Sequence, residues 1–181
     1  MNGAAPFGPR TSEEPMAFTR DESWAAALRS WGVFLLLICT AMSAAVVSTP
    51  GMAPGFFSSL WVLLLTSFWT SVLGGAVSAV MMLCALPVAR RIGHGLRTQP
   101  RIGVHIATYA GLGAVTGALA GVLVAWVPSL GAYASASSVI GFALLGAAFT
   151  APSTALGWWL TARKALRADA RFMNADTEKD G

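Results

Sequence analysis

Few side chains in the long apolar stretches of this sequence are of a type that performs catalysis or binds metal. Those that titrate are His105, Tyr109, Cys39 and Cys84. A nucleophile needs a base beside it and a metal needs several ligands, but neither cysteine has a histidine neighbour or a CxxC spacing. His94, in a basic segment, has no second ligand nearby. We therefore expect no catalytic site, no metal site, no cofactor and no enzymatic activity.

Charged residues are scarce and confined to three segments of the chain. They make up 11% of the sequence, against about 25% in ordinary soluble domains, while hydrophobic residues make up 55%. Asp, Glu, Lys and Arg are all missing from residues 31 to 89 and again from residues 102 to 162. Each uncharged stretch has room for two helices of about 20 residues, enough to cross about 30 Å of hydrocarbon. The sequence predicts an all-α membrane protein, a bundle of four transmembrane helices.

The predicted transmembrane domain covers residues 19–162, with spans at about 31–48, 58–87, 103–126 and 136–160. Residues 1–18, with three prolines, are expected to form a disordered leader, and residues 163–181 a basic tail. Thr19 and Glu22 match a capping box, which places a helix start there. The first span also resembles the apolar core of a secretory signal peptide, so its cleavage is an open alternative.

Glycine and proline residues are expected to bend, end or kink the second and fourth spans. A bend is expected at Gly74 and Gly75, because a helix running from Ser59 to Leu86 exceeds the thickness of the bilayer core. Pro87 is expected to end this second span. Pro152 lacks an N–H and is expected to kink the fourth span as a hinge.

The distribution of cations predicts the orientation of the chain. All 12 Lys and Arg lie on one side of the predicted topology, so the positive-inside rule places the N and C termini in the cytoplasm. The cations near the spans, expected to fix topology or to bind anionic lipid, are Arg90, Arg91, Arg97, Arg101, Arg163, Lys164, Arg167 and Arg171. The richness in Ala, Gly and Arg suggests a bacterial source and hence the inner, or plasma, membrane.

Two side chains are expected to mark the cytoplasmic interface. His105 follows Arg101 by about one helical turn, where water and headgroups would reach it. Its imidazole is either hydrogen-bonded to a headgroup or the backbone, or is a pH-sensitive switch contact. Trp158 is expected at the same level, in an aromatic belt.

Small residues form two strips at helical spacing. Gly113, Gly117 and Gly121 recur at every fourth position of the third span. The second strip lies on one face of the second span and comprises Ser67, Ser71, Gly74 and Ser78, with Gly75 as a further packing residue. We expect these two strips to pack against each other, because small side chains let helix backbones approach closely.

The function expected from these features is association rather than chemistry. The spans lack acids, cations, Asn and Gln, which argues against an ion-coupled transporter. We expect an accessory subunit, scaffold or regulator of a membrane complex, or alternatively a small oligomeric channel or permease. Its partners would be the lipid bilayer and itself or another membrane protein. Nucleic acid is not expected, because the cations flank apolar spans instead of covering a folded polar surface.

Overall fold

The structure, a computed structural model, describes residues 14–49, 56–126 and 135–179. Within these ranges it is helical and contains no strand. The helices are α1 (Arg20–Ser48), α2 (Phe56–Trp69), the π-helix η1 (Thr70–Gly74), α3 (Gly75–Leu96), α4 (Ile102–Trp126) and α5 (Ala136–Lys179). Because α2, η1 and α3 follow one another without a break, they form one long helix, called here the second span.

Among the described residues, four helices are long and apolar enough to cross a membrane. They cover Arg20–Ser48, Ser58–Leu96, Ile102–Trp126 and Ala136–Arg171. This number agrees with the four spans predicted from the placement of charge. Length and composition of this kind are those of a multi-pass membrane protein.

The start of α1 is capped as predicted. The Thr19 N–H donates to Glu22 Oε2 at 2.9 Å, and the Glu22 N–H donates to Thr19 Oγ1 at 3.2 Å, which completes a capping box. The residues just before it were expected to be disordered, but Met16 is 4% exposed and its N–H donates to the Arg97 carbonyl at 3.2 Å. Burial and hydrogen bonding offset the entropy lost on ordering these residues. Residues 1–13 of the predicted leader lie outside the described part of the chain.

The second span is longer than predicted and does not end at Pro87. It continues as regular helix to Leu96, carrying Arg90 and Arg91 with it. A proline inside a helix costs about 3 kcal/mol, but ending the helix there would leave up to four carbonyls without partners beside an apolar environment. Continuing the helix is the cheaper solution. The bend expected at Gly74 and Gly75 coincides with the end of η1, a π-helical segment of the kind that interrupts regular winding.

The fourth span also runs on past its predicted end. α5 is continuous through Pro152 and through the basic segment expected to be a tail, as far as Lys179. Its 44 residues correspond to about 66 Å of helix, roughly twice the thickness of the hydrocarbon core. The hinge at Pro152 stays a prediction.

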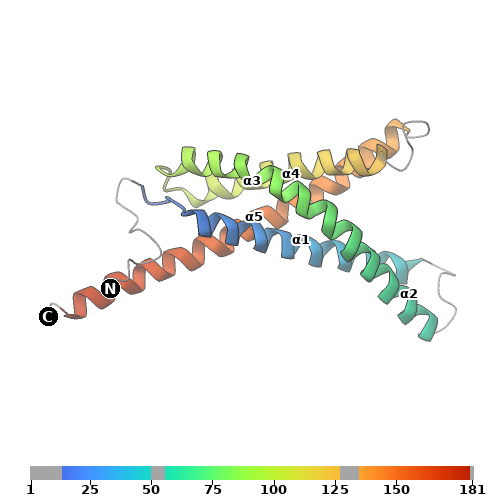
Figure 1. Cartoon of the computed structure of the whole chain (residues 1–181), viewed down its shortest axis with the longest axis horizontal. Coiled ribbons are helices and arrows are strands. Elements are labelled where there is room, and N and C mark those ends of the chain that lie inside the picture. Colours follow the sequence, from blue (N-terminus) through green and yellow to red (C-terminus); the bar gives the residue numbers. More distant parts are fainter. Residues whose placement is uncertain (1–13, 50–55, 127–134, 180–181) are drawn as a thin grey trace.

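The helices are arranged around α5. Figure 1 shows α4 and α1 packed along different parts of α5, with α2 beside α1 and α3 reaching α4. The beginning of α1, the connection between α3 and α4 and the far end of α5 all lie at one end of the molecule. We call this the charged end, because residues 14–24, 90–101 and 163–171 gather there. Toward the other end, α1 and α2 diverge from α4 and α5 (Figure 1).

The glycine strip of α4 packs against α5 and not against the second span. A Cβ on Gly117 would collide with the Thr150 side chain and the Gly146 backbone, and one on Gly121 with the Phe142 carbonyl. Gly113 meets Thr150 and Thr154 in the same way. The expected partner was wrong because α5 supplies a complementary surface: Gly146 opposite Gly117, and hydroxyls that reach α4 carbonyls. Thr150 Oγ1 donates to the Gly113 carbonyl at 2.6 Å, and Thr154 Oγ1 to that of Tyr109 at 2.9 Å.

The small residues of the second span face α1 instead. Trp31 Nε1 donates to Ser78 Oγ at 2.9 Å, and Cys39 Sγ lies 3.4 Å from Ser71 Oγ. A Cβ on Gly75 would lie 3.9 Å from the Leu35 side chain, an ordinary contact distance. Gly74 has no other helix within 4 Å of its Cβ position. Hydroxyl and indole groups therefore connect these helices without the close backbone approach seen between α4 and α5.

Candidate functional site

Four aromatic rings form a cluster at the charged end. The rings of His105 and Trp158 are stacked, with centroids 4.9 Å apart and planes 8° apart. The Tyr109 ring also stacks on Trp158, with centroids 5.5 Å apart and planes 18° apart. The Phe18 ring meets Trp158 edge-on, with centroids 5.7 Å apart. His105 and Tyr109 are four residues apart, so they lie on one face of α4 and both reach the same ring. Trp158, expected in an interfacial belt, is instead 3% exposed at the centre of this cluster.

His105 is enclosed by protein. It is 1% exposed, which corrects the expectation that water and headgroups reach it. Its Nε2 lies 2.9 Å from the Gln99 carbonyl, which accepts only, so Nε2 carries a proton in this contact. Of the two interpretations of its role, a hydrogen bond to the backbone matches this geometry.

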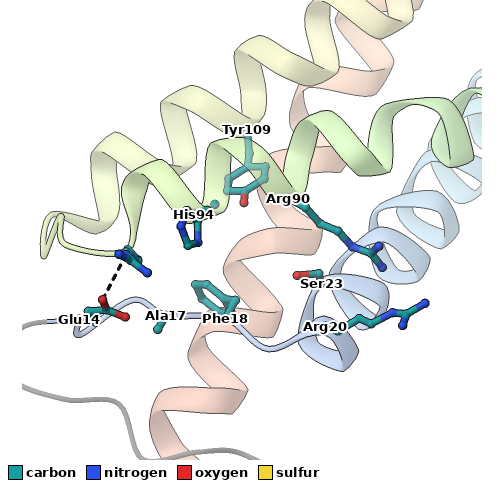
Figure 2. A pocket seen from close by; sticks show the side chains of 10 residues that line it. Glu14, Ala17, Phe18, Arg20, Ser23, Arg90, His94 and Tyr109 are labelled. Carbon is teal, nitrogen blue, oxygen red and sulfur yellow. Dashed lines mark ion pairs between the residues drawn. The ribbon is translucent and has the colours of Figure 1, made fainter.

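Beside the aromatic cluster lies a cavity of about 450 Å³. Figure 2 shows it between the start of α1, the last turns of α3 and the first turns of α4. Its lining residues are Glu14, Ala17, Phe18, Arg20, Ser23, Arg90, Gly93, His94, Arg97 and Tyr109. The segment before α1, expected to be unstructured, thus forms one wall of the cavity, and the rings of Phe18 and Tyr109 join it to the aromatic cluster.

Arg90 is the residue of the cavity whose hydrogen bonding is incomplete. Its Nε and Nη2 atoms are buried and have no hydrogen-bond partner among the described residues. A buried donor without an acceptor costs about 1–3 kcal/mol, and more when it is charged. The guanidinium carbon lies 5.6 Å from the centroid of the Trp24 ring, a cation–π contact that offsets part of this cost. The arrangement leaves a cation whose Nε and Nη2 donors lack oxygen acceptors among the described residues.

The other charged groups of the cavity are more exposed. Arg97 Nε lies 3.2 Å from Glu14 Oε1, and both side chains are more than a third exposed, so this ion pair adds little stability. Arg20 and His94 are exposed. Counting side chains, the lining holds three guanidinium groups and one carboxylate. The cavity therefore has a positive electrostatic potential suited to an anion.

The remaining cations expected to act at the membrane do not line this cavity. Arg91 and Arg101 are exposed beside it, and Arg163, Lys164, Arg167 and Arg171 are exposed along α5. Arg163 lies over the Trp159 ring, with its guanidinium carbon 5.1 Å from the centroid. Of the eight cations that the sequence analysis grouped together, Arg90 and Arg97 therefore line the cavity and the other six do not.

Sequence patterns alone did not indicate that this cavity exists. Glu14, Phe18 and Tyr109 come from three distant parts of the chain, and the first two belong to a segment expected to be disordered. One signal was present, because the four-residue spacing of His105 and Tyr109 predicts a shared contact on one helix face. No family model, curated protein or solved structure matches the chain, so the site is defined by its own geometry.

Proposed function

We propose that this chain is a non-enzymatic integral membrane protein that acts by association, as an accessory subunit, scaffold or regulator of a membrane complex. The observation that carries the proposal is the extension of α5. About half of its 44 residues suffice to cross a bilayer, and the rest continue from the charged end as helix. In Figure 1 this part of α5 extends beyond the ends of the other helices. A helical extension of this kind presents a surface to a partner outside the bilayer.

The charges on this extension support the same proposal. Arg163, Lys164, Arg167 and Arg171 are exposed, and three of them recur at four-residue intervals on one face of the helix. Under the positive-inside rule this end lies in the cytoplasm, with both termini, and the membrane is the bacterial inner membrane. An acidic surface on a cytoplasmic or membrane partner would complement the row of cations.

The packing of α1 supports its retention in the mature protein. Gly157 of α5 lies so close to Ser30 that a Cβ would collide with the Ser30 backbone. Arg29 Nη1 also donates to Thr161 Oγ1 at 2.7 Å. Cleavage of the first span as a signal peptide would remove both contacts and would expose Thr161, which is 3% exposed.

The alternative, an oligomeric channel or permease, has one observation in its favour. Ser43 and Ser67, Cys39 and Ser71, and Trp31 and Ser78 form successive polar contacts between α1 and the second span. They lie next to η1, and π-helical segments are frequent at functional sites. Repacking of this polar seam against a second copy of the chain would line a path with hydroxyl groups.

Purification from native membranes in mild detergent, followed by mass spectrometry and a native mass, tests the proposal. We expect a stoichiometric second protein that is lost from the variant R163Q/R167Q/R171Q. The matched control, R91Q/R97Q/R101Q, removes the same charge from the end of α3 and its connection to α4 and should retain the partner. Recovery of the chain alone, as a defined oligomer, would contradict the accessory role and favour the channel, for which flux into liposomes is the next measurement.

A further inference from the structure

The cavity at the charged end combines positive charge with empty space. Arg20, Arg90 and Arg97 contribute to its lining, and Glu14, the acid that lines it with them, is bound to Arg97. The lining cations outside this ion pair are therefore Arg90 and Arg20, the latter in the first turn of α1. Low-dielectric walls concentrate such a potential inside a cavity.

The orientation of Arg90 points to the kind of ligand. Figure 2 shows its side chain extending from α3 toward the turn of α1 that carries Ser23 and Arg20. Its Nε and Nη2 donors have no acceptor among the described residues, although both are buried. Nε and one terminal nitrogen are a pair that forms two parallel hydrogen bonds to a carboxylate or phosphate. Both atoms are shielded from water, so an oxyanion in the cavity would supply their acceptors once the Arg90 head turned toward it.

The size and walls of the cavity narrow the choice of anion. A volume of about 450 Å³ falls within the range of small-molecule sites and exceeds what a bare inorganic ion fills. The rings of Phe18 and Tyr109 form part of the wall and suit carbon-bound groups. Gly93 lets the Tyr109 ring lie close against α3, because a Cβ there would lie 2.9 Å from Tyr109 Oη.

We propose that this cavity binds the phosphate group of a small organic ester, with Arg90 as its main ligand and Arg20 as a second cation. A glycerophospholipid headgroup and a soluble phosphate ester offer this same chemistry. A headgroup would enter from the leaflet next to the charged end, and a soluble ester from the aqueous phase. The proposal concerns the single chain, so it holds or fails independently of whether the protein has a protein partner.

The experiment uses the full chain purified in an uncharged detergent and two probes. Native mass spectrometry measures binding of phosphatidylglycerol, with phosphatidylcholine as the zwitterionic comparison. Thermal unfolding measures binding of glycerol 3-phosphate, with sodium chloride at the same ionic strength as the comparison. We expect one tightly bound molecule of at least one probe per chain. Competition between the probes then identifies the source: glycerol 3-phosphate displaces the lipid if the site takes soluble esters, and does not if the site is built for a headgroup.

Two variants with the same loss of charge decide whether the cavity is responsible. In R90Q the affinity should fall about tenfold or more, because charge-assisted hydrogen bonds are lost. In R91Q, which removes an exposed cation one residue away on the same helix, it should fall by less than about twofold. Equal losses in the two variants, or binding of neither probe to the wild-type chain, would overturn the proposal, since only diffuse attraction or no attraction would then exist.

Nε and Nη2 of Arg90 have no acceptor to lose among the described residues, so R90Q should unfold within a few degrees of the wild-type protein when no ligand is added. Should R90Q fail to fold, R90K decides the question. Lysine keeps the charge but not the planar fork, so a severalfold weaker affinity supports recognition by Arg90. Unchanged affinity in R90K would overturn the assignment of Arg90 as the bidentate ligand.

Discussion

Two helix contacts in this protein that involve small residues are built in opposite ways. Between α4 and α5 the backbones approach so closely that a Cβ on Gly113, Gly117 or Gly121 has no room. Between α1 and the second span, side chains bridge a wider separation through bonds such as that from Trp31 to Ser78. A Cβ on Gly75, in the second contact, would meet its neighbours at ordinary van der Waals distances.

This difference indicates which small residues tolerate no larger side chain. In an apolar solvent helices gain little from hydrophobic burial, so close van der Waals packing is the main source of association between spans. Backbone atoms cannot move aside for a larger side chain, whereas an indole or a hydroxyl can turn. We therefore expect the α4–α5 contact to be intolerant of substitution and the α1 contact to adapt.

The sharpest test of the comparison is G117L. The new side chain would meet Gly146 backbone atoms that cannot give way, so we expect a loss of about 3 kcal/mol or more, up to failure to fold. The control is G111L, on the same helix, where nothing lies within 4 Å of the Cβ position. Thermal unfolding in detergent and crosslinking between α4 and α5 measure the difference. Equal stability of the two variants would refute a packing role for Gly117.

A second test addresses the charged end of the α4–α5 contact, where the two helices meet through aromatic rings and not through glycines. W158A removes a ring that contacts His105, Tyr109 and Phe18, and we expect it to cost about 3 kcal/mol. The control W61A truncates a tryptophan of α2 that is 67% exposed and should change stability little. Unfolding of both variants in detergent measures the effect. A cost for W158A no greater than that for W61A would show that the aromatic cluster does not hold α4 to α5.

Much of this fold was predictable because charge and length decide it. The uncharged stretches gave four helices, and the Thr19–Glu22 spacing gave a capping box that the structure confirms. The end of the second span was not predictable from Pro87, because the preference of proline is local. The carbonyls of the preceding turn need hydrogen-bond partners, and this need overrides that preference.

The helix that packs on the glycine strip was not predictable from the sequence, because small residues on α4 do not specify which helix packs against them. α5 carries its complement as Gly146 and two threonines, a pattern less obvious than the run of small residues on the second span. The cavity was harder still, since it depends on Glu14 and Phe18 docking onto distant helices. Such contacts arise from tertiary packing, which periodicity and charge do not report.

A smaller effect is expected from removing one hydroxyl within the tight contact. T150V keeps the shape of the side chain but loses the donation to the Gly113 carbonyl at 2.6 Å. We expect a loss of about 1 kcal/mol, within the range measured for hydrogen bonds between helices in membranes. T116V is the control, because the Thr116 hydroxyl bonds only to carbonyls of its own helix. A loss for T150V as large as that for G117L would show that the hydroxyl, and not close backbone approach, dominates this contact.

The smallest effect is expected where the looser contact is cut. S78A removes the acceptor for Trp31 Nε1, and we expect a loss of about 0.6 kcal/mol, the average for such bonds in a membrane. A double-mutant cycle with W31F isolates the bond itself, because the phenyl ring keeps most of the packing and removes the donor. Coupling of that size, together with a similar loss in T150V, would mean that hydroxyl bonds contribute alike in both contacts. The greater intolerance of the α4–α5 contact would then come from its glycines. Coupling well above 1 kcal/mol would contradict this view and would make the seam beside η1 a rigid joint, unsuited to the repacking that a channel needs.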